Sequence, residues 1–202
     1  MAEIRSICVY CGSSPGNDPI YVEAALAFGE ALARERIKLV YGGGGIGMMG
    51  ALADAALAGG GEVTGIIPDF LVAREKALEG ARAVIVTNDM HERKRTMFEL
   101  ADAFVALPGG IGTLEELVEQ MTWIQLGQHR KPLLLLNLKG FWDPLIALLK
   151  HQQQEGFIRK GSFQYLLADQ PEQIIPMLRE AARDIPEDQL RNGVAKAVAE
   201  EM

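Results

Sequence analysis

The sequence predicts an α/β protein with a doubly wound, mostly parallel, Rossmann-like sheet and helices on both faces. Short apolar runs alternate with longer amphipathic segments along most of the chain. The apolar runs are rich in Val, Ile and Leu and do not alternate with polar residues, which is typical of strands buried on both faces. Such β-α repetition favours parallel strands joined by right-handed crossovers.

The strands are expected where these short apolar runs occur. In chain order they are Ile4–Tyr10, Lys38–Tyr41, Glu62–Ile67, Arg82–Thr87, Ala103–Leu107, Leu133–Asn137 and Phe163–Leu167. The segments between them are long enough for crossover helices. In chain order the expected helices are Pro19–Arg36, Ile46–Ala58, Met90–Ala101, Leu114–Leu126, Phe141–Gln153 and Pro171–Arg183.

Local signals support several of these helices. In the first, Tyr21, Ala25, Phe28 and Leu32 recur at the spacing of one helical face. The third follows Asn88 and Asp89, either of which can cap a helix. The fourth begins with Thr113-x-x-Glu116, which has the form of a capping box with Glu116 at the third helical position.

The chain length suits one domain, and no internal repeat or linker divides it. A chain of 202 residues can bury one sizeable core. We expect residues 1–185 to form a single domain and residues 186–202 to form a charged, Ala-rich C-terminal tail.

Composition excludes some partners and compartments. The net charge is −7, so the chain is poorly suited to neutralise a long nucleic acid, and we expect no such partner. No segment approaches about 18 unbroken apolar residues and no signal peptide is visible, so we expect a cytoplasmic protein without a membrane partner.

The only two cysteines, Cys8 and Cys11, form a C-x-x-C at the end of an apolar run. A redox dithiol usually lies at the start of a helix, and a zinc site needs about four ligands. We therefore interpret the pair as reduced thiols and expect no metal site.

Ligands of doubly wound sheets bind beyond the carboxyl ends of the strands. Four loops follow strands and carry unusual residues: Cys11–Pro15, Gly42–Gly50, Asn88–Lys94 and Pro108–Glu116. These loops are the candidate site.

The loop Pro108–Glu116 is typical of a phosphate cradle. Gly109, Gly110 and Gly112 permit a sharp turn and a close approach of the backbone to a ligand. The first N–H groups of the following helix have no partner within the helix and can bind an anion. The alternative is a plain tight turn with a capped helix.

The loop Gly42–Gly50 contains a G-x-G-x-x-G at Gly45, Gly47 and Gly50. That motif suggests dinucleotide binding, although here it follows the second strand rather than the first, and Asp69, which falls near the ribose-binding offset, follows Pro68 in a loop. Further candidate phosphate or nucleotide contacts are Gly12, Ser13, Gly43, Gly44, Gly45, Gly47 and Gly109.

The third loop places two cations near a helix N-terminus. Arg93 and Lys94 would oppose the helix dipole by about 0.3–1 kcal/mol each, which a bound anion would compensate. The alternative is a solvated basic patch, and His91 alone indicates no base. Taken alone, Glu75 would be a surface carboxylate and Thr122 a helix-face hydroxyl.

Four motifs together resemble one family. CVYCGSS, YGGGGIGMMG, MHERK and PGGIGTLEE occur in the order and spacing of the LOG family, the cytokinin riboside 5′-monophosphate phosphoribohydrolases often labelled lysine decarboxylase-like. The resemblance covers the chain from about Ile4 to Arg183. Pyridoxal phosphate chemistry needs a Schiff-base lysine and a partner for the pyridine nitrogen, and no such set of residues is evident.

The resemblance implies a hydrolase that releases a free base and ribose 5-phosphate from AMP or an N6-substituted AMP. It also implies a homodimer, no cofactor, and a catalytic pair formed by Arg93 and Glu116. The implied substrate contacts are Glu75, Arg93, Lys94, Gly110, Ile111, Gly112, Thr113, Leu114, Glu115, Glu116 and Thr122.

Two functions of other classes remain open from the residues. An NAD(P)-dependent oxidoreductase would use the Gly45–Gly50 motif but leaves the second glycine loop without a role. A non-catalytic nucleotide carrier would bind AMP without releasing adenine.

Overall fold

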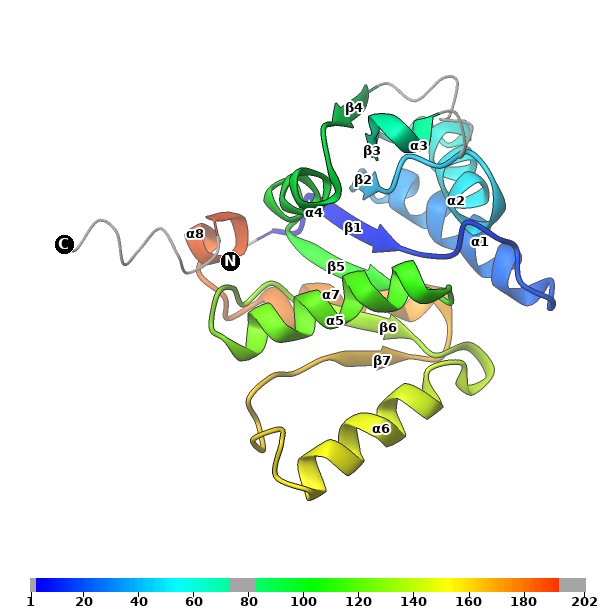
Figure 1. Ribbon diagram of the computed structural model, residues 1–202. Coiled ribbons are helices and arrows are strands. Elements are labelled where there is room, and N and C mark those ends of the chain that lie inside the picture. The colour runs from blue at the N-terminus through cyan, green and yellow to red at the C-terminus, as the bar shows by residue number, and fades with distance from the viewer. Residues whose placement is uncertain (1–2, 73–82, 193–202) are drawn as a thin grey trace.

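The computed structural model describes residues 3–72 and 83–192, which contain a parallel seven-stranded sheet with the order β4-β3-β2-β1-β5-β6-β7 (Figure 1). The strands are β1 Ser6–Tyr10, β2 Lys38–Tyr41, β3 Val63–Pro68, β4 Ala83–Thr87, β5 Ala103–Ala106, β6 Leu133–Leu136 and β7 Leu166–Ala168. All six strand pairs are parallel, as the β-α repetition predicts.

Helices connect the strands. They are α1 Ile20–Arg34, α2 Gly47–Ala58, α3 Asp69–Val72, α4 Met90–Glu99, α5 Ile111–Gln125, α6 Asp143–Gln154, α7 Ile174–Ala182 and α8 Glu187–Asn192, with short 3-10 turns at Leu138–Gly140 and Pro171–Gln173. Within the described ranges, no helix has both the length and the apolar content needed to cross a bilayer.

The strand order reverses between β1 and β5. The chain runs outward from β1 through β2 and β3 to β4, and then returns to pair β5 with the other side of β1. Val9 of β1 lies in register with Tyr41 of β2 and with Val105 of β5. Because the connections after β1 and β5 leave toward opposite faces, a crevice opens at their carboxyl ends.

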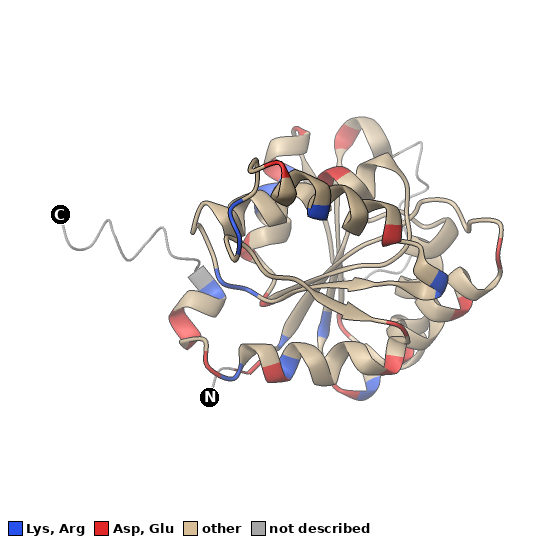
Figure 2. Cartoon of the chain, turned by 90° about the horizontal axis from the view of Figure 1, so that it is seen from below, with Lys and Arg blue, Asp and Glu red and all other residues tan. Residues whose placement is uncertain are grey.

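Two core layers cover the two faces of the sheet. Ile7 and Val9 of β1 pack in the layer that contains α1, α2 and α7, whereas Cys8 and Tyr10 pack in the layer with α4, α5 and α6. This alternation follows the two-residue repeat of a strand. Figure 2 shows the strands between the two layers, with most charged positions on the surrounding helices and loops.

The structure corrects some expected boundaries. Helix α5 begins at Ile111, its N-cap is Gly110, and no side chain caps it, so the predicted Thr113–Glu116 capping box does not form. The last strand is Leu166–Ala168 rather than Phe163–Leu167. Helix α3 was not predicted, because four residues are too short to show helical periodicity.

The start of the expected tail is helical. Helix α8 lies within residues 186–202, and its Leu190 is fully buried in the layer with α1 and α7. One buried apolar residue among charged neighbours gives too little pattern to predict such docking.

The close contact between α1 and α2 yields a stability prediction. A Cβ at Gly29 of α1 would overlap the backbone carbonyl of Leu52 in α2. We expect Gly29→Ala to lower the free energy of unfolding by about 1–3 kcal/mol, because the two helices must move apart. Urea denaturation measures this change. Leu26→Ala on the exposed side of α1 is the control, and equal stability of the two variants would contradict the prediction.

Candidate active site

The four loops predicted from the sequence meet at the carboxyl edge of the sheet. The Gly12 N–H donates to the Pro108 carbonyl at 3.1 Å, and the Met49 N–H donates to the Gly12 carbonyl at 3.2 Å. Arg93 Nη2 donates to the Gly42 carbonyl at 3.2 Å and so joins the fourth loop. These bonds place the loops around one crevice at the β1/β5 reversal.

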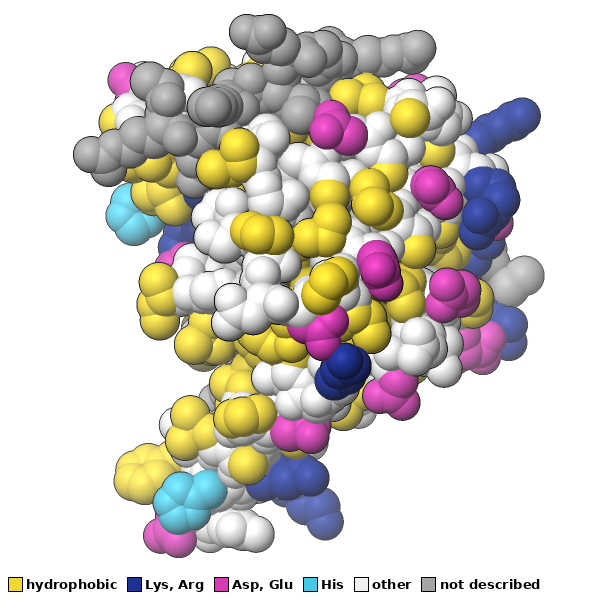
Figure 3. Space-filling view, turned by 90° about the vertical axis from the view of Figure 1, so that its right-hand side faces the viewer, with side chains coloured by type: hydrophobic (Ala, Val, Ile, Leu, Met, Phe, Trp, Pro, Cys, Tyr) yellow, Lys and Arg dark blue, Asp and Glu magenta, His cyan; other side chains and the backbone are white. Residues whose placement is uncertain are grey.

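A cavity of about 230 Å³ lies among these loops. Its lining comprises Val9–Ser13, Gly42, Met49, Arg93, Gly110–Thr113 and Glu116. Figure 3 views the molecule from the carboxyl ends of the strands, where exposed backbone and small side chains are interspersed with hydrophobic groups. The site therefore presents mainly backbone, with one cation and one carboxylate among its side chains.

Arg93 is a buried cation whose orientation is fixed by backbone carbonyls. Only 7% of the residue is exposed, and its Nε donates to the Ile66 carbonyl at 3.1 Å while Nη2 donates to Gly42. Asp89 caps the start of α4, as expected, by accepting from the Glu92 N–H, and this places Arg93 just past the first turn. Charge-assisted bonds of this kind hold a guanidinium in one plane.

Glu116 lies one turn into α5 beside this cation. Its Oε1 is 3.9 Å from Nη1 of Arg93, and the residue is 8% exposed. That separation is an ion pair longer than a direct hydrogen bond. The carboxylate is thus held in a desolvated place at the cavity wall, where electrostatic interactions are stronger than in water.

Neutral weak acids lie near Glu116, and of these Tyr10 and Cys11 line the cavity whereas Cys8 does not. Burial raises the pKa of the Cys8 and Cys11 thiols, and the negative charge of Glu116 raises both further. Burial likewise raises the pKa of the Tyr10 hydroxyl, with added contributions from Cys8 and Glu116. Both cysteines are free thiols, as expected, and they remain protonated at neutral pH.

The N-terminus of α5 opens into the cavity. The N–H groups of Ile111, Gly112 and Thr113 have no acceptor within the helix, and the N-cap Gly110 offers no side chain. A Cβ at Gly110 or Gly112 would meet no atom within 4 Å, whereas one at Gly109 would overlap Thr113. Packing thus requires Gly109, and the other two glycines leave room above free donors.

Packing explains the glycines of the second loop. Gly47 has φ +62° and lies against the Ser13 backbone, and a Cβ at Gly50 would overlap Gly45. Gly43 also has a positive φ, of +80°. The G-x-G-x-x-G motif is therefore accounted for by close backbone contacts. Of this loop, Gly42 and Met49 line the cavity, and the candidates Gly43, Gly44, Gly45 and Gly47 do not.

Lys94 does not line the cavity. Its Nζ lies 2.6 Å from Glu115 and 2.8 Å from Glu119 of α5. Burial lowers the pKa of Lys94, but hydrogen bonds to the two carboxylates outweigh that effect and raise it. Lys94 therefore has carboxylate partners within its own chain, and its contact with a substrate stays a prediction.

The remaining predicted contacts are placed elsewhere. Leu114 packs partly into the core, and Thr122 Oγ1 donates to the Val118 carbonyl at 2.8 Å on the exposed side of α5. Neither residue lines the cavity, nor does Glu115. Glu75 lies outside the described residues.

Some residues near the site were not predicted. Val9 and Tyr10 line the cavity beside Cys11 of the first predicted loop, and their place at the carboxyl end of the first strand was the available signal. Lys131 was not predicted either, and its buried Nζ donates to the carbonyls of Phe98 and Ala101 at 2.8 and 2.7 Å. Lys131 thereby caps the C-terminus of α4, the helix that carries Arg93.

His129 was also missed. Its ring packs against Phe98 and Phe104 with 1% exposure. Burial, together with the nearby charge of Lys131, lowers the pKa of His129 to about 4.

This burial predicts a pH dependence of stability. The unfolded chain binds a proton at His129 near pH 6.5, whereas the folded chain does so only near pH 4. Stability should therefore fall as the pH falls from 6.5 to 4, by about 3 kcal/mol from this residue. Urea denaturation of the wild type and His129→Phe across this range measures the effect, with His151→Phe as an exposed control. Parallel profiles for the wild type and His129→Phe would contradict it.

Comparison with known proteins agrees with the motif resemblance. A family model described as "Possible lysine decarboxylase" matches residues 49–178. A cytokinin riboside 5′-monophosphate phosphoribohydrolase of Arabidopsis thaliana is 45% identical over 180 residues, which is 89% of this chain and 84% of that protein. The protein of the same name from Rhodococcoides fascians is 48% identical over 76% of this chain and 78% of its own.

Solved structures share the fold. A molybdenum cofactor binding protein from Rippkaea orientalis superposes with a TM-score of 0.67 at 23% identity, covering 89% of this chain and 98% of that one.

Proposed function

The chain belongs to the LOG family of cytokinin riboside 5′-monophosphate phosphoribohydrolases, and on that premise we propose that it hydrolyses the N-glycosidic bond of adenosine-type nucleoside 5′-monophosphates. The products are a free base and ribose 5-phosphate. The substrate is AMP or an N6-substituted AMP. The observation that carries the proposal is the Arg93–Glu116 pair in the wall of a cavity that also holds a free helix N-terminus.

The substrate phosphate binds at the N-terminus of α5 in this proposal. The unpaired N–H groups of Ile111, Gly112 and Thr113 and the helix dipole favour an anion there. The open space at Gly110 and Gly112 supports a close approach of phosphate oxygens to the backbone. Binding energy from this remote group orients the ribose.

Glu116 then faces the ribose from the same helix. As the bond between C1′ and the base nitrogen breaks, its electron pair goes to the base, and positive charge develops at C1′ and the ring oxygen. The carboxylate stabilises this charge and accepts a proton from the water whose oxygen bonds to C1′. The leaving base takes up a proton in turn.

Arg93 fixes the position of the Glu116 carboxylate relative to the substrate in this proposal. Its guanidinium is tied to the Ile66 and Gly42 carbonyls, so Nη1 is the nitrogen that faces Glu116. This fixed cation attracts the Glu116 carboxylate and can bond to a substrate oxygen.

The decarboxylase description of the family model receives no support from the site. Pyridoxal phosphate enzymes need a lysine amine for a Schiff base. Among the described residues that line the cavity there is no lysine, and Lys94 is engaged by two carboxylates.

The central test is base release. Incubation with AMP and with N6-isopentenyl-AMP, followed by separation of base from nucleotide, should give free base and ribose 5-phosphate. Glu116→Gln and Arg93→Ala should each lower the rate by at least about 100-fold while the circular dichroism spectrum is retained.

The matched control removes a surface pair of the same residue types. Arg183 and Glu180 lie 2.6 Å apart on the exposed side of the C-terminal region, and Glu180→Gln with Arg183→Ala should leave the rate unchanged. Tight AMP binding without adenine release by the wild type would instead identify a nucleotide carrier. Near-normal turnover by Glu116→Gln would refute the assigned role.

We propose further that the chain forms a homodimer through the exposed side of α5. Ile111, Val118 and Leu126 are 82%, 41% and 66% exposed and recur on one side of this helix together with Glu115 and Thr122. Ile111 also lines the cavity, so a second copy packed on this stripe would cover the cavity mouth. It would also bring Thr122 of one copy toward the cavity of the other copy. Thr122 does not line the cavity of its own chain.

The dimer can be tested by mass. Light scattering coupled to gel filtration should give twice the mass of the chain for the wild type. Val118→Arg should shift the protein toward the monomer, because a charge would be buried without a partner. Leu148→Arg, at a similarly exposed site on α6, is the control. A monomeric wild type would contradict the proposal.

A further inference from the structure

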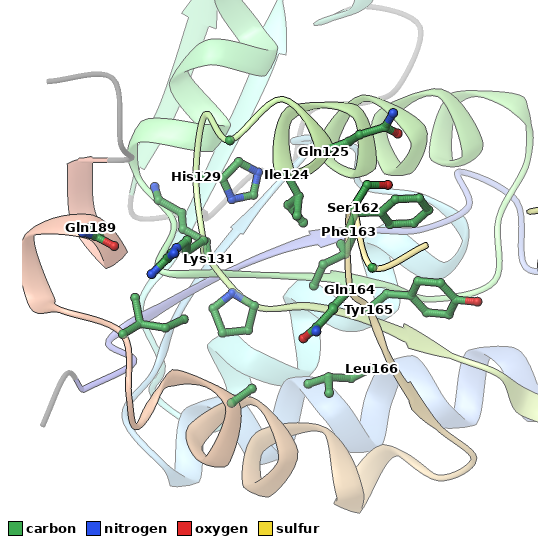
Figure 4. A pocket seen from close by; sticks show the side chains of 17 residues that line it. Ile124, Gln125, His129, Lys131, Ser162, Phe163, Gln164, Tyr165, Leu166 and Gln189 are labelled. Carbon is green, nitrogen blue, oxygen red and sulfur yellow. The ribbon is translucent and has the colours of Figure 1, made fainter. Parts of the chain in front are cut away.

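A second cavity lies far from the candidate active site. It has a volume of about 790 Å³ and is lined at the amino ends of β6 and β7, by the C-terminal end of α5, and by α7 and α8 (Figure 4). We call it the distal cavity. Helix α5 links the two sites, because Ile111 lines the first and Ile124 and Gln125 line the second.

Several polar groups at the distal cavity are buried without a hydrogen-bond partner. Ser162 Oγ and Gln189 Oε1 have none among the described residues. Both ring nitrogens of the fully buried His129 likewise lack a hydrogen bond of ordinary geometry, with only the Gln120 backbone acting on the ring. Buried polar groups normally find partners, and these three come from separate segments that converge on one cavity.

The lining selects against cations. Although the chain carries 27 acidic residues, none of the described residues that line the distal cavity is Asp or Glu. Arg130 and Lys131 are present, and Lys131 is held by backbone carbonyls. A neutral or weakly anionic ligand therefore suits the cavity.

The lining also favours a flat ligand with several hydrogen-bonding groups. The rings of Phe163 and Tyr165 lie 6.1 Å apart, tilted by 30°, and offer apolar faces. Side-chain amides of Gln125, Gln164 and Gln189 supply donors and acceptors together. In Figure 4, Gln164 lies between Phe163 and Tyr165 on one side and His129 and Lys131 on the other.

We propose that the distal cavity binds a purine-type base. Amides pair with the edges of such bases, and aromatic rings stack on their faces. The buried imidazole of His129 lies in the wall behind these groups, and its low pKa, about 4, keeps it neutral at physiological pH, so its resonances can report on a ligand nearby. The choice of a purine rests on the proposed function, which makes the free base the product that accumulates around the enzyme.

Histidine NMR tests the site without using turnover. The chain has three histidines, so the Cε1–H resonance of His129 can be assigned with a His129→Phe variant. Titration with adenine at pH 7 should shift this resonance saturably, while those of His91 and His151 stay in place. Gln164→Leu combined with Gln189→Leu should raise the dissociation constant for adenine at least about tenfold, because two hydrogen-bonding amides are lost.

Controls separate the possible outcomes. Gln128→Leu, an exposed amide beside His129 that does not line the cavity, should leave adenine binding unchanged. Ribose 5-phosphate should not move the His129 signal, and an equal shift with this anion would overturn the assignment to a base. An unmoved His129 at high adenine, or identical binding by the double variant, would also overturn it. Because the readout is independent of Glu116, failure here leaves the proposed reaction untouched, and loss of that reaction leaves this result untouched.

Discussion

The buried guanidinium of Arg93 is the interaction on which the site depends. A charge out of water is tolerated when it has polar partners, and Arg93 donates to the carbonyls of Ile66 and Gly42 and forms an ion pair with Glu116 at 3.9 Å. The same contacts tie α4, β2, β3 and α5 together across the crevice. The contacts of Arg93 therefore both stabilise the loops around the crevice and fix the geometry of the proposed catalytic pair.

The glycines divide into two groups with different physical roles. Gly47, Gly50 and Gly109 allow backbones to touch, and they bring the loops together. Gly110 and Gly112 touch nothing and keep the helix N-terminus uncovered. The glycine-rich loops thus contain some glycines that packing requires and others that leave room for a ligand.

Helix α5 joins three surfaces. Its N-terminus faces the candidate active site, its exposed stripe is the proposed dimer contact, and its C-terminal end lines the distal cavity. Lys131, at the distal cavity, caps α4 and so supports the helix that carries Arg93. A ligand at the distal end would contact elements that are continuous with the catalytic pair.

The parallel sheet, the alternation of strands and helices along the chain and the four loops at the carboxyl edge of the sheet were predicted from the sequence alone, because apolar periodicity and glycine clusters are local signals. The family resemblance of the motifs also predicted that Arg93 and Glu116 belong to one site, and the two side chains form an ion pair at 3.9 Å. Only the tertiary structure decided that Lys94 pairs with Glu115 and Glu119, that Thr122 lies outside the cavity, and that His129 and Lys131 are buried. These outcomes depend on which helix faces pack together, and that depends on contacts between residues far apart in the chain.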